Sequence, residues 1–240
     1  MKTVMSDNLL EKSVDDIDQL IERVGSVILN ADYRILNQFY VKNSTTGAEN
    51  TVKSGVGKLN DYIINYQAPT EEMFISIIIS KNVSDEIVLI NIYGKYPDGW
   101  KLNILQYGQY KVNGQTAPEL YSKAKEKFEK GYLIDAAHYI FLCSKVVNPA
   151  RKVWQYQKEN EILSLLEEIR TSISNEYIFP LTLDEIDSKP QILAIYPQRI
   201  QEGYFPMIEY VTNIDLKDTV RTKAENDKIH NVIGHTFRGI

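Results

Sequence analysis

The chain has 240 residues and a mass of 27.6 kDa, a length that suits one large domain or two small ones. Apolar residues make up 43% and charged residues 25%, close to the averages of soluble globular proteins, which excludes disordered and fibrous classes. The 27 basic and 32 acidic side chains give a net charge of −5. Because no overall positive field attracts polyanions, we expect no nucleic-acid partner.

The apolar runs bear on the compartment. The longest ones, 74–79 and 139–143, fall far short of the roughly 20 residues of a membrane-spanning helix. Residues 1–8 also lack the apolar stretch of a secretory signal, which predicts a cytoplasmic protein. Export or lipid anchoring is the alternative if a signal segment has been removed. Cys143, the single cysteine, lies in an apolar run and is expected to be a buried hydrophobe.

The first part of the chain shows helical spacing. Apolar residues recur at three- and four-residue steps over 13–30, with acidic and basic side chains between them, which predicts an amphipathic helix. The same spacing predicts helices over 33–41 and over 52–66, although Gly55 and Gly57 weaken the last of these.

Strands are expected after Pro69. The segments 74–79 and 86–96 are rich in β-branched and aromatic residues, and a long strand is expected over 100–112, with Gly108 marking a bend or bulge. The turn 97–99 predicts a hairpin. A three-residue loop that pairs Tyr96 with Trp100 keeps the apolar faces together, with Gly99 in the left-handed region.

The middle of the chain predicts three helices. Thr116 to Glu119 has the pattern of a capping box, which starts a helix that ends near Glu129. A second helix is expected over 134–147, and a third from Asn148-Pro149 through Trp154 to Ile169.

The end of the chain is expected to form a small unit of its own. A second capping-box pattern at 182–185 starts a short helix before Pro190, strands follow at 191–196 and 205–214, and Asp215 caps a final helix. The prediction is an α+β protein: N-terminal helices packed on a curved antiparallel sheet, a central helical hairpin, and a C-terminal strand-strand-helix unit. The regions expected are 1–115, 116–176 and 177–240.

Two segments resemble known families. The spacing of seven residues in 116–149 resembles a single tetratricopeptide repeat, against the alternative of an ordinary helical hairpin; these are Tyr121, Ala124, Phe128, Gly131, Ala137, Phe141 and Pro149. The element order of residues 13–113 resembles the cone-shaped fold of ketosteroid isomerase and nuclear transport factor. That resemblance implies a concavity used either as a catalytic pocket or as a docking surface. An isomerase would need a carboxylate base and an acid or phenol donor; the candidates are Asp32, Tyr33, Tyr40, Asp61, Tyr62, Tyr93 and Tyr107.

The residues that could hold a metal are few. His230 and His235 are five positions apart, so they do not share a helix face, and only His138 and Cys143 add to them. Phosphate-binding and dinucleotide-binding motifs are also missing from the sequence. We expect no metal and no cofactor.

Tyrosine is abundant, with 16 residues, and this side chain is enriched at interfaces. The candidate binding residues lie on the expected strands of the first region and near the end of the chain: Tyr93, Tyr96, Trp100, Tyr107, Tyr110, Tyr204 and Tyr210. The alternative is that these rings pack the sheet against the helices. The predicted function is a non-catalytic binding or assembly module with a protein partner. The alternative is a small-molecule-binding protein, or an isomerase-like or hydrolase-like enzyme, with its pocket in the N-terminal region.

Overall fold

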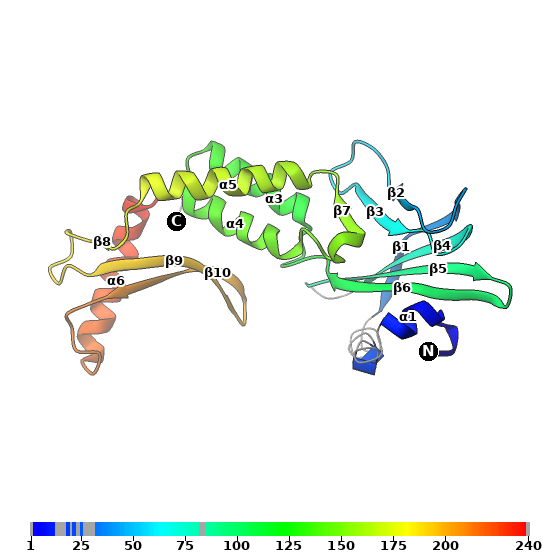
Figure 1. The fold of residues 1–240 in the computed structure, drawn as a ribbon. Coiled ribbons are helices and arrows are strands. Elements are labelled where there is room, and N and C mark those ends of the chain that lie inside the picture. The colour runs from blue at the N-terminus through cyan, green and yellow to red at the C-terminus, as the bar shows by residue number, and fades with distance from the viewer. Residues whose placement is uncertain are drawn as a thin grey trace. The chain divides into compact units, whose positions relative to one another are not determined.

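The computed structural model describes residues 2–12, 18–19, 21–22, 25, 32–81 and 85–238. The chain divides into two compact units. Unit 1 comprises Met1–Pro118 and Ser144–Glu159, and unit 2 comprises Glu119–Cys143 and Asn160–Ile240. Both units contain helices and antiparallel strands, which confirms the predicted α+β class (Figure 1).

A four-stranded antiparallel sheet forms the centre of unit 1. Its order is β1-β4-β5-β6, with β1 at Tyr33–Lys42, β4 at Glu72–Ser80, β5 at Ile87–Tyr96 and β6 at Gly99–Gln109. Side chains alternate between its two faces. On one face the isoleucine and valine side chains of β4 and β5 are fully buried, with no exposed area on Ile75, Ile77, Ile79, Val88, Ile90 or Ile92. We call this the isoleucine face.

The other face of this sheet carries a short helix. The segment begins with η1 (Lys2–Val4) and continues as α1 (Asp7–Lys12). Ser6 donates its backbone N–H to the carbonyl of Leu102. Leu9 and Leu10 pack against a buried cluster formed by Met5, Leu89, Leu102 and Leu105.

A second sheet in unit 1 has three strands in the order β2-β3-β7, with β2 at Glu49–Lys53, β3 at Tyr62–Gln67 and β7 at Trp154–Tyr156. Trp154 stacks on Tyr62, with ring centroids 3.8 Å apart, and Tyr110 and Tyr156 meet it edge-on. Asn37 of β1 donates to the hydroxyl of Tyr62 over 2.6 Å, which links the two sheets of the unit.

Two of the predicted N-terminal helices are wrong. Residues 33–41 form β1, which pairs along its length with β4. Residues 52–66 form parts of β2 and β3, and the turn between them has Gly57 at a φ of 93°, outside the helical region. The predicted helix over 13–30 lies mostly outside the described residues, and of its members 18, 19, 21, 22 and 25 are helical.

The hairpin between β5 and β6 exists, but its predicted loop length is wrong. Tyr96 pairs with Gly99, so the loop has two residues, and Trp100 lies opposite Lys95. The register then shifts near Tyr93, so that Ile92 pairs with Ile104 as predicted. Gly99 has the expected positive φ, at 123°. Gly108 lies within β6 in regular pairing with Val88, so the irregularity expected there falls nearer the turn.

The two middle helices are confirmed as α3 (Ala117–Glu129) and α4 (Leu133–Val146). The third is partly wrong, because Arg151–Val153 form a 3-10 turn, η2, and Trp154 lies in β7. The helix α5 then spans Glu159–Glu176. No helix in the part of the chain that the structure describes has the length and apolarity to cross a membrane.

Unit 2 ends with a sheet and a helix. The sheet order is β10-β9-β8, with β8 at Leu181–Thr182, β9 at Gln191–Ile200 and β10 at Gly203–Val211, followed by α6 (Thr219–Thr236). The core beneath it contains Ile134, Leu183, Ile186, Ile192, Ile229, Ile233 and Phe237. The predicted strands and final helix are confirmed. The short helix expected between the capping box at 182–185 and Pro190 is wrong, since β8 ends at Thr182 and only turns follow it. Asp218 rather than Asp215 caps α6.

Candidate binding surface

The face of the four-stranded sheet opposite the isoleucine face contains a groove of about 450 Å³ lined by Phe74, Ser76, Tyr93 and Trp100. We call it the aromatic groove. Strand register brings these residues together. Phe74 of β4 lies opposite Tyr93 of β5, and Trp100 of β6 lies opposite Lys95, two positions from Tyr93 on the same face. The neighbouring strands β4, β5 and β6 therefore all contribute residues that line the aromatic groove.

Two exposed rings stand at the edge of the aromatic groove. Trp100 is 43% exposed and Tyr40 is 54% exposed. Their centroids are 6.5 Å apart in an edge-on arrangement. Tyr40 lies on β1 directly opposite Phe74, so all four strands of the sheet contribute an aromatic side chain to one surface.

A polar group fixes the orientation of Tyr40. Its hydroxyl donates to Oε2 of Glu72 over 2.5 Å, and Nζ of Lys95 lies 3.0 Å from the same oxygen. The hydrogen bond from Tyr40 is the main cause that lowers the pKa of Glu72, and the bond from Lys95 adds to it. The same bond to Glu72 raises the pKa of Tyr40. The rim therefore holds an ionised carboxylate between a phenol and an ammonium group.

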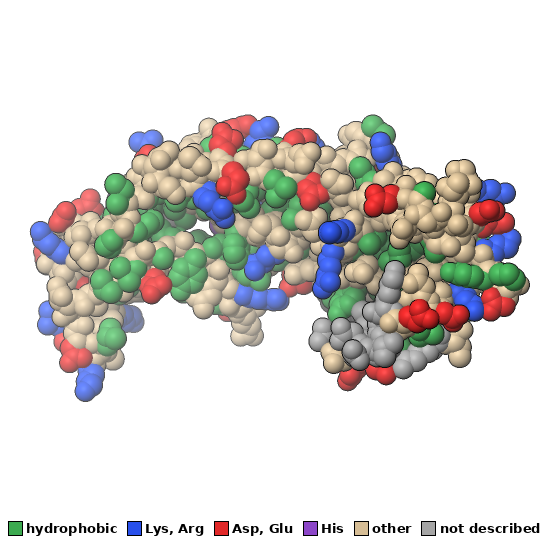
Figure 2. All heavy atoms as spheres, in the orientation of Figure 1, with side chains coloured by type: hydrophobic (Ala, Val, Ile, Leu, Met, Phe, Trp, Pro, Cys, Tyr) green, Lys and Arg blue, Asp and Glu red, His purple; other side chains and the backbone are tan. Residues whose placement is uncertain are grey.

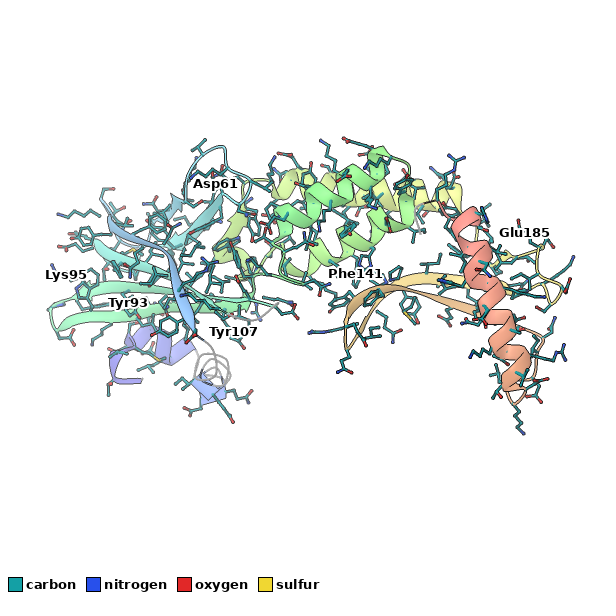
Figure 3. All side chains as sticks on the ribbon, turned by 180° about the vertical axis from the view of Figure 1, so that it is seen from behind. Asp61, Tyr93, Lys95, Tyr107, Phe141 and Glu185 are labelled. Atoms are coloured by element: carbon teal, nitrogen blue, oxygen red, sulfur yellow. The ribbon has the colours of Figure 1, made fainter. Side chains whose placement is uncertain are left out.

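The structure separates the predicted tyrosines of unit 1. Tyr93 and Trp100 line the aromatic groove. Tyr107 lies on the same face of the sheet but packs against the buried cluster of Met5, Leu89, Leu102 and Leu105. Tyr96 alternates to the isoleucine face, where its hydroxyl donates to Asn103 over 2.8 Å, and Tyr110 is buried against Trp154. Figure 3 shows Tyr93, Lys95 and Tyr107 along the sheet and Asp61 away from them.

The two predicted tyrosines of unit 2 are placed differently. The guanidinium of Arg199 lies 5.8 Å from the centre of the Tyr204 ring. Tyr210 packs on the core of the unit, and burial raises its pKa. Other apolar side chains are exposed on the hairpin of β9 and β10, among them Tyr196, Phe205 and Met207. Figure 2 shows apolar side chains gathered over β9 and β10.

Two residues proposed for an isomerase-like site have structural contacts. Asp61 accepts a hydrogen bond from the backbone N–H of Lys58 over 2.8 Å and one from the hydroxyl of Ser54 over 3.3 Å, which closes the turn between β2 and β3. Tyr62 lies in the stack with Trp154, and burial is the main cause that raises its pKa. Within the described residues, no group of three potential ligands could hold a metal ion.

Sequence reasoning missed Phe74 and Ser76, and it named Tyr40 only as a candidate of an isomerase-like site, not as a binding residue. The alternation of 74–79 carries a signal for the first two, because Phe74 and Ser76 share a face of any strand that includes them. Tyr40 could be placed on this surface only once residues 33–41 are recognised as a strand.

In comparisons with protein families, curated proteins and solved structures, the chain matches none of them.

Proposed function

We propose that this chain is a non-catalytic protein-binding module, and that an extended segment of a partner protein docks in the aromatic groove. The observation that carries the proposal is the pair Tyr40 and Trp100, large rings left 54% and 43% exposed above a floor of Phe74 and Tyr93. Rigid aromatic side chains lose little conformational entropy on binding, and they dominate interface hot spots.

The lining indicates the chemistry of the partner segment. Aromatic grooves on sheet surfaces suit proline-rich segments, whose extended conformation is already formed before binding. The indole N–H of Trp100 and the hydroxyl of Ser76 supply donors for the carbonyl groups of such a segment, which its prolines leave unpaired. We therefore propose a proline-rich segment as the occupant.

Catalysis in the same groove is the second candidate, because a volume of about 450 Å³ falls within the range of small-molecule pockets. A general base working near neutral pH needs a carboxylate whose pKa is raised. Glu72, the carboxylate at the rim, has a lowered pKa and is held by Tyr40 and Lys95. Because Glu72 is a weak base in this arrangement, it is poorly suited to proton transfer. We therefore favour the binding function.

The two family resemblances stay proposals. The four-stranded antiparallel sheet supports the cone-like reading of residues 13–113, although the strand β1 occupies 33–42, where that reading implies a helix. The helices α3 and α4 support the tetratricopeptide-like hairpin at 116–149.

The test measures binding of the full chain to synthetic ten-residue peptides, proline-rich ones and alanine-substituted controls, by fluorescence polarisation. Trp100→Ala and Tyr40→Ala should each weaken binding by about tenfold or more, the effect of a hot spot. Tyr196→Ala and Phe205→Ala are matched controls, because these rings are 43% and 44% exposed but lie in unit 2. Equal losses of peptide affinity in the two pairs of variants would overturn the placement of the binding site in the aromatic groove.

The two tryptophans provide a second readout. Trp100 is exposed, whereas Trp154 is 1% exposed and should resist acrylamide quenching. A bound peptide should reduce quenching in the wild type and have no effect in Trp100→Phe, where only Trp154 emits. Peptide binding without any protection of Trp100 would show that the segment docks elsewhere.

A further inference from the structure

A second concavity of unit 1 is lined mainly by polar residues. It consists of two adjoining hollows of about 560 and 420 Å³ that share Asn65 and Lys152. It lies mainly on the three-stranded sheet and the turn η2, with Ile104 of β6 at one side, and it shares no lining residue with the aromatic groove. We call it the amide groove, because five side-chain amides line it: Asn50, Asn65, Gln67, Asn148 and Gln155.

Alternation along the strands produces this lining. Ile64 and Tyr66 of β3 point into the unit and are buried, so Asn65 and Gln67 point outward. Thr51 lies opposite Asn65 on β2 and joins the same surface. Asn65 Nδ2 donates to the backbone carbonyl of Lys152 over 3.4 Å, which joins the sheet to η2 at the junction of the two hollows.

Two cations lie side by side in η2. Arg151 and Lys152 are exposed, and within the described part of the chain neither side chain has an ion-pair or hydrogen-bond partner. The same holds there for the amides of Asn148 and Gln155. The smaller hollow also contains Glu159, so its formal charge is +1, with Glu49 at the other end of the groove.

The backbone of Arg151 is strained. Its φ is +52°, in the left-handed region that side chains other than glycine rarely adopt. Such strain clusters at sites that bind ligands, because function keeps a residue that stability alone would replace with glycine. Here it places a guanidinium at the smaller hollow.

We propose that the amide groove binds an acidic oligosaccharide, with its acid group at Arg151 and Lys152. Sugar hydroxyls both donate and accept, as side-chain amides do, and carboxylates such as Glu49 accept from hydroxyls. Ile104 and Val153 give the larger hollow an apolar part for the C–H face of a sugar ring. The guanidinium and ammonium groups make charge-assisted bonds to a carboxylate or sulfate.

The experiment is calorimetric titration of the full chain with trigalacturonate, with a sulfated heparin disaccharide, and with neutral maltotriose. One acidic ligand or both should bind at least about tenfold more tightly than maltotriose, and the difference should shrink at high salt. The two acidic ligands distinguish a carboxylate from a sulfate. If maltotriose binds as tightly as the acidic ligands, the proposed role of the two cations is wrong. If none of the three ligands binds at about 10 mM, on the order of the weakest useful affinity, the amide groove is not a saccharide site.

Inorganic sulfate is the control for a simple anion site. If sulfate alone competes as well as the sulfated disaccharide binds, the saccharide part of the proposal is wrong. Gln155→Ala tests the amides, since it should weaken the acidic ligands without changing the effect of salt.

The variants separate binding from folding. Arg151→Gly should weaken the acidic ligands by about tenfold while leaving the melting temperature unchanged or higher, because glycine removes the strain at this φ. Arg151→Gln with Lys152→Gln should abolish the preference for acidic ligands. The control is Arg221→Gln with Lys223→Gln, which makes the same change of net charge on exposed positions of α6. Equal losses in the control would show that only overall charge matters and would overturn the site.

Discussion

A Cβ atom on Gly108 would lie 1.8 Å from the carbonyl oxygen of Pro149. The two residues are 41 positions apart in sequence (149 − 108 = 41), yet the backbone of β6 and that of the segment after α4 are in direct contact. Gly108 pairs with Val88 inside the sheet and has no positive φ, so close approach rather than turn geometry requires glycine here.

Gly108→Ala should therefore destabilise unit 1 by about 3 kcal/mol, since the methyl group can be accommodated only if the backbone moves. The measurement is chemical denaturation followed by fluorescence. Gln106→Ala, two positions away in β6, is the control and should cost less than about 1 kcal/mol. A similar free energy of unfolding for both variants would contradict the contact.

The two aspartates before α6 provide a matched pair. Asp218 caps the helix by accepting from the backbone N–H of Arg221 over 3.0 Å, whereas Asp215 accepts from Lys217 in the preceding turn. Asp218→Ala should cost about 1 kcal/mol, the typical value of a cap, and Asp215→Ala about half of that or less. Thermal unfolding of the two variants tests this, and a larger loss in Asp215→Ala would favour the cap predicted from the sequence.

The thiol of Cys143 should be inert in the native protein. It has no exposed area, and burial raises its pKa from 9.0 to about 12. Because only the thiolate reacts, its native reaction with a disulfide reagent at about pH 8 should be roughly 1,000-fold slower than in the unfolded chain. Ser144→Cys places a thiol at the neighbouring exposed position and should react at once. Rapid labelling of native Cys143 would contradict its burial.

Glu72 should make stability depend on acid pH. Its pKa in the folded chain lies below the ordinary value of 4.5, mainly because Tyr40 donates to it. A lowered folded pKa means that the stabilisation is fully present above about pH 4.5 and is lost as the pH falls through the folded pKa. Glu72→Gln should therefore reduce the free energy of unfolding at neutral pH, and the difference from the wild type should shrink in acid. Glu202→Gln, in the turn between β9 and β10, is the control for the loss of one carboxylate, and chemical denaturation of both variants over this pH range is the measurement.

Local pattern was sufficient for some elements and insufficient for others. The helices within 117–146 follow from a capping box and the breaks at Gly131 and Pro149, and the strand at 74–79 follows from its β-branched and aromatic residues. Residues 33–42 carry no such signal, because Ile35, Phe39 and Tyr40 fit one face of a helix as well as a strand. Pairing with β4, some 30 residues later, decides between the two.

The candidate site depends on register more than on composition. The predicted three-residue loop would place Trp100 on the face of Tyr96, whereas the observed two-residue loop places it with Tyr93. A shift of one residue moves a side chain to the other face of a sheet, and sequence alone did not resolve it. The abundance of tyrosine on the expected strands therefore does not by itself predict which rings share a surface.

The strand β7 joins β3 at Tyr62 and Tyr156, and unit 1 needs residues on both sides of 119–143. During synthesis, the ribosome must therefore release the chain past Tyr156 before the second sheet of unit 1 can close around Trp154. Until then Tyr62 and Tyr110 lack the ring that buries them. A nascent chain that has not yet reached Tyr156 therefore leaves these rings open to aggregation and to chaperone capture.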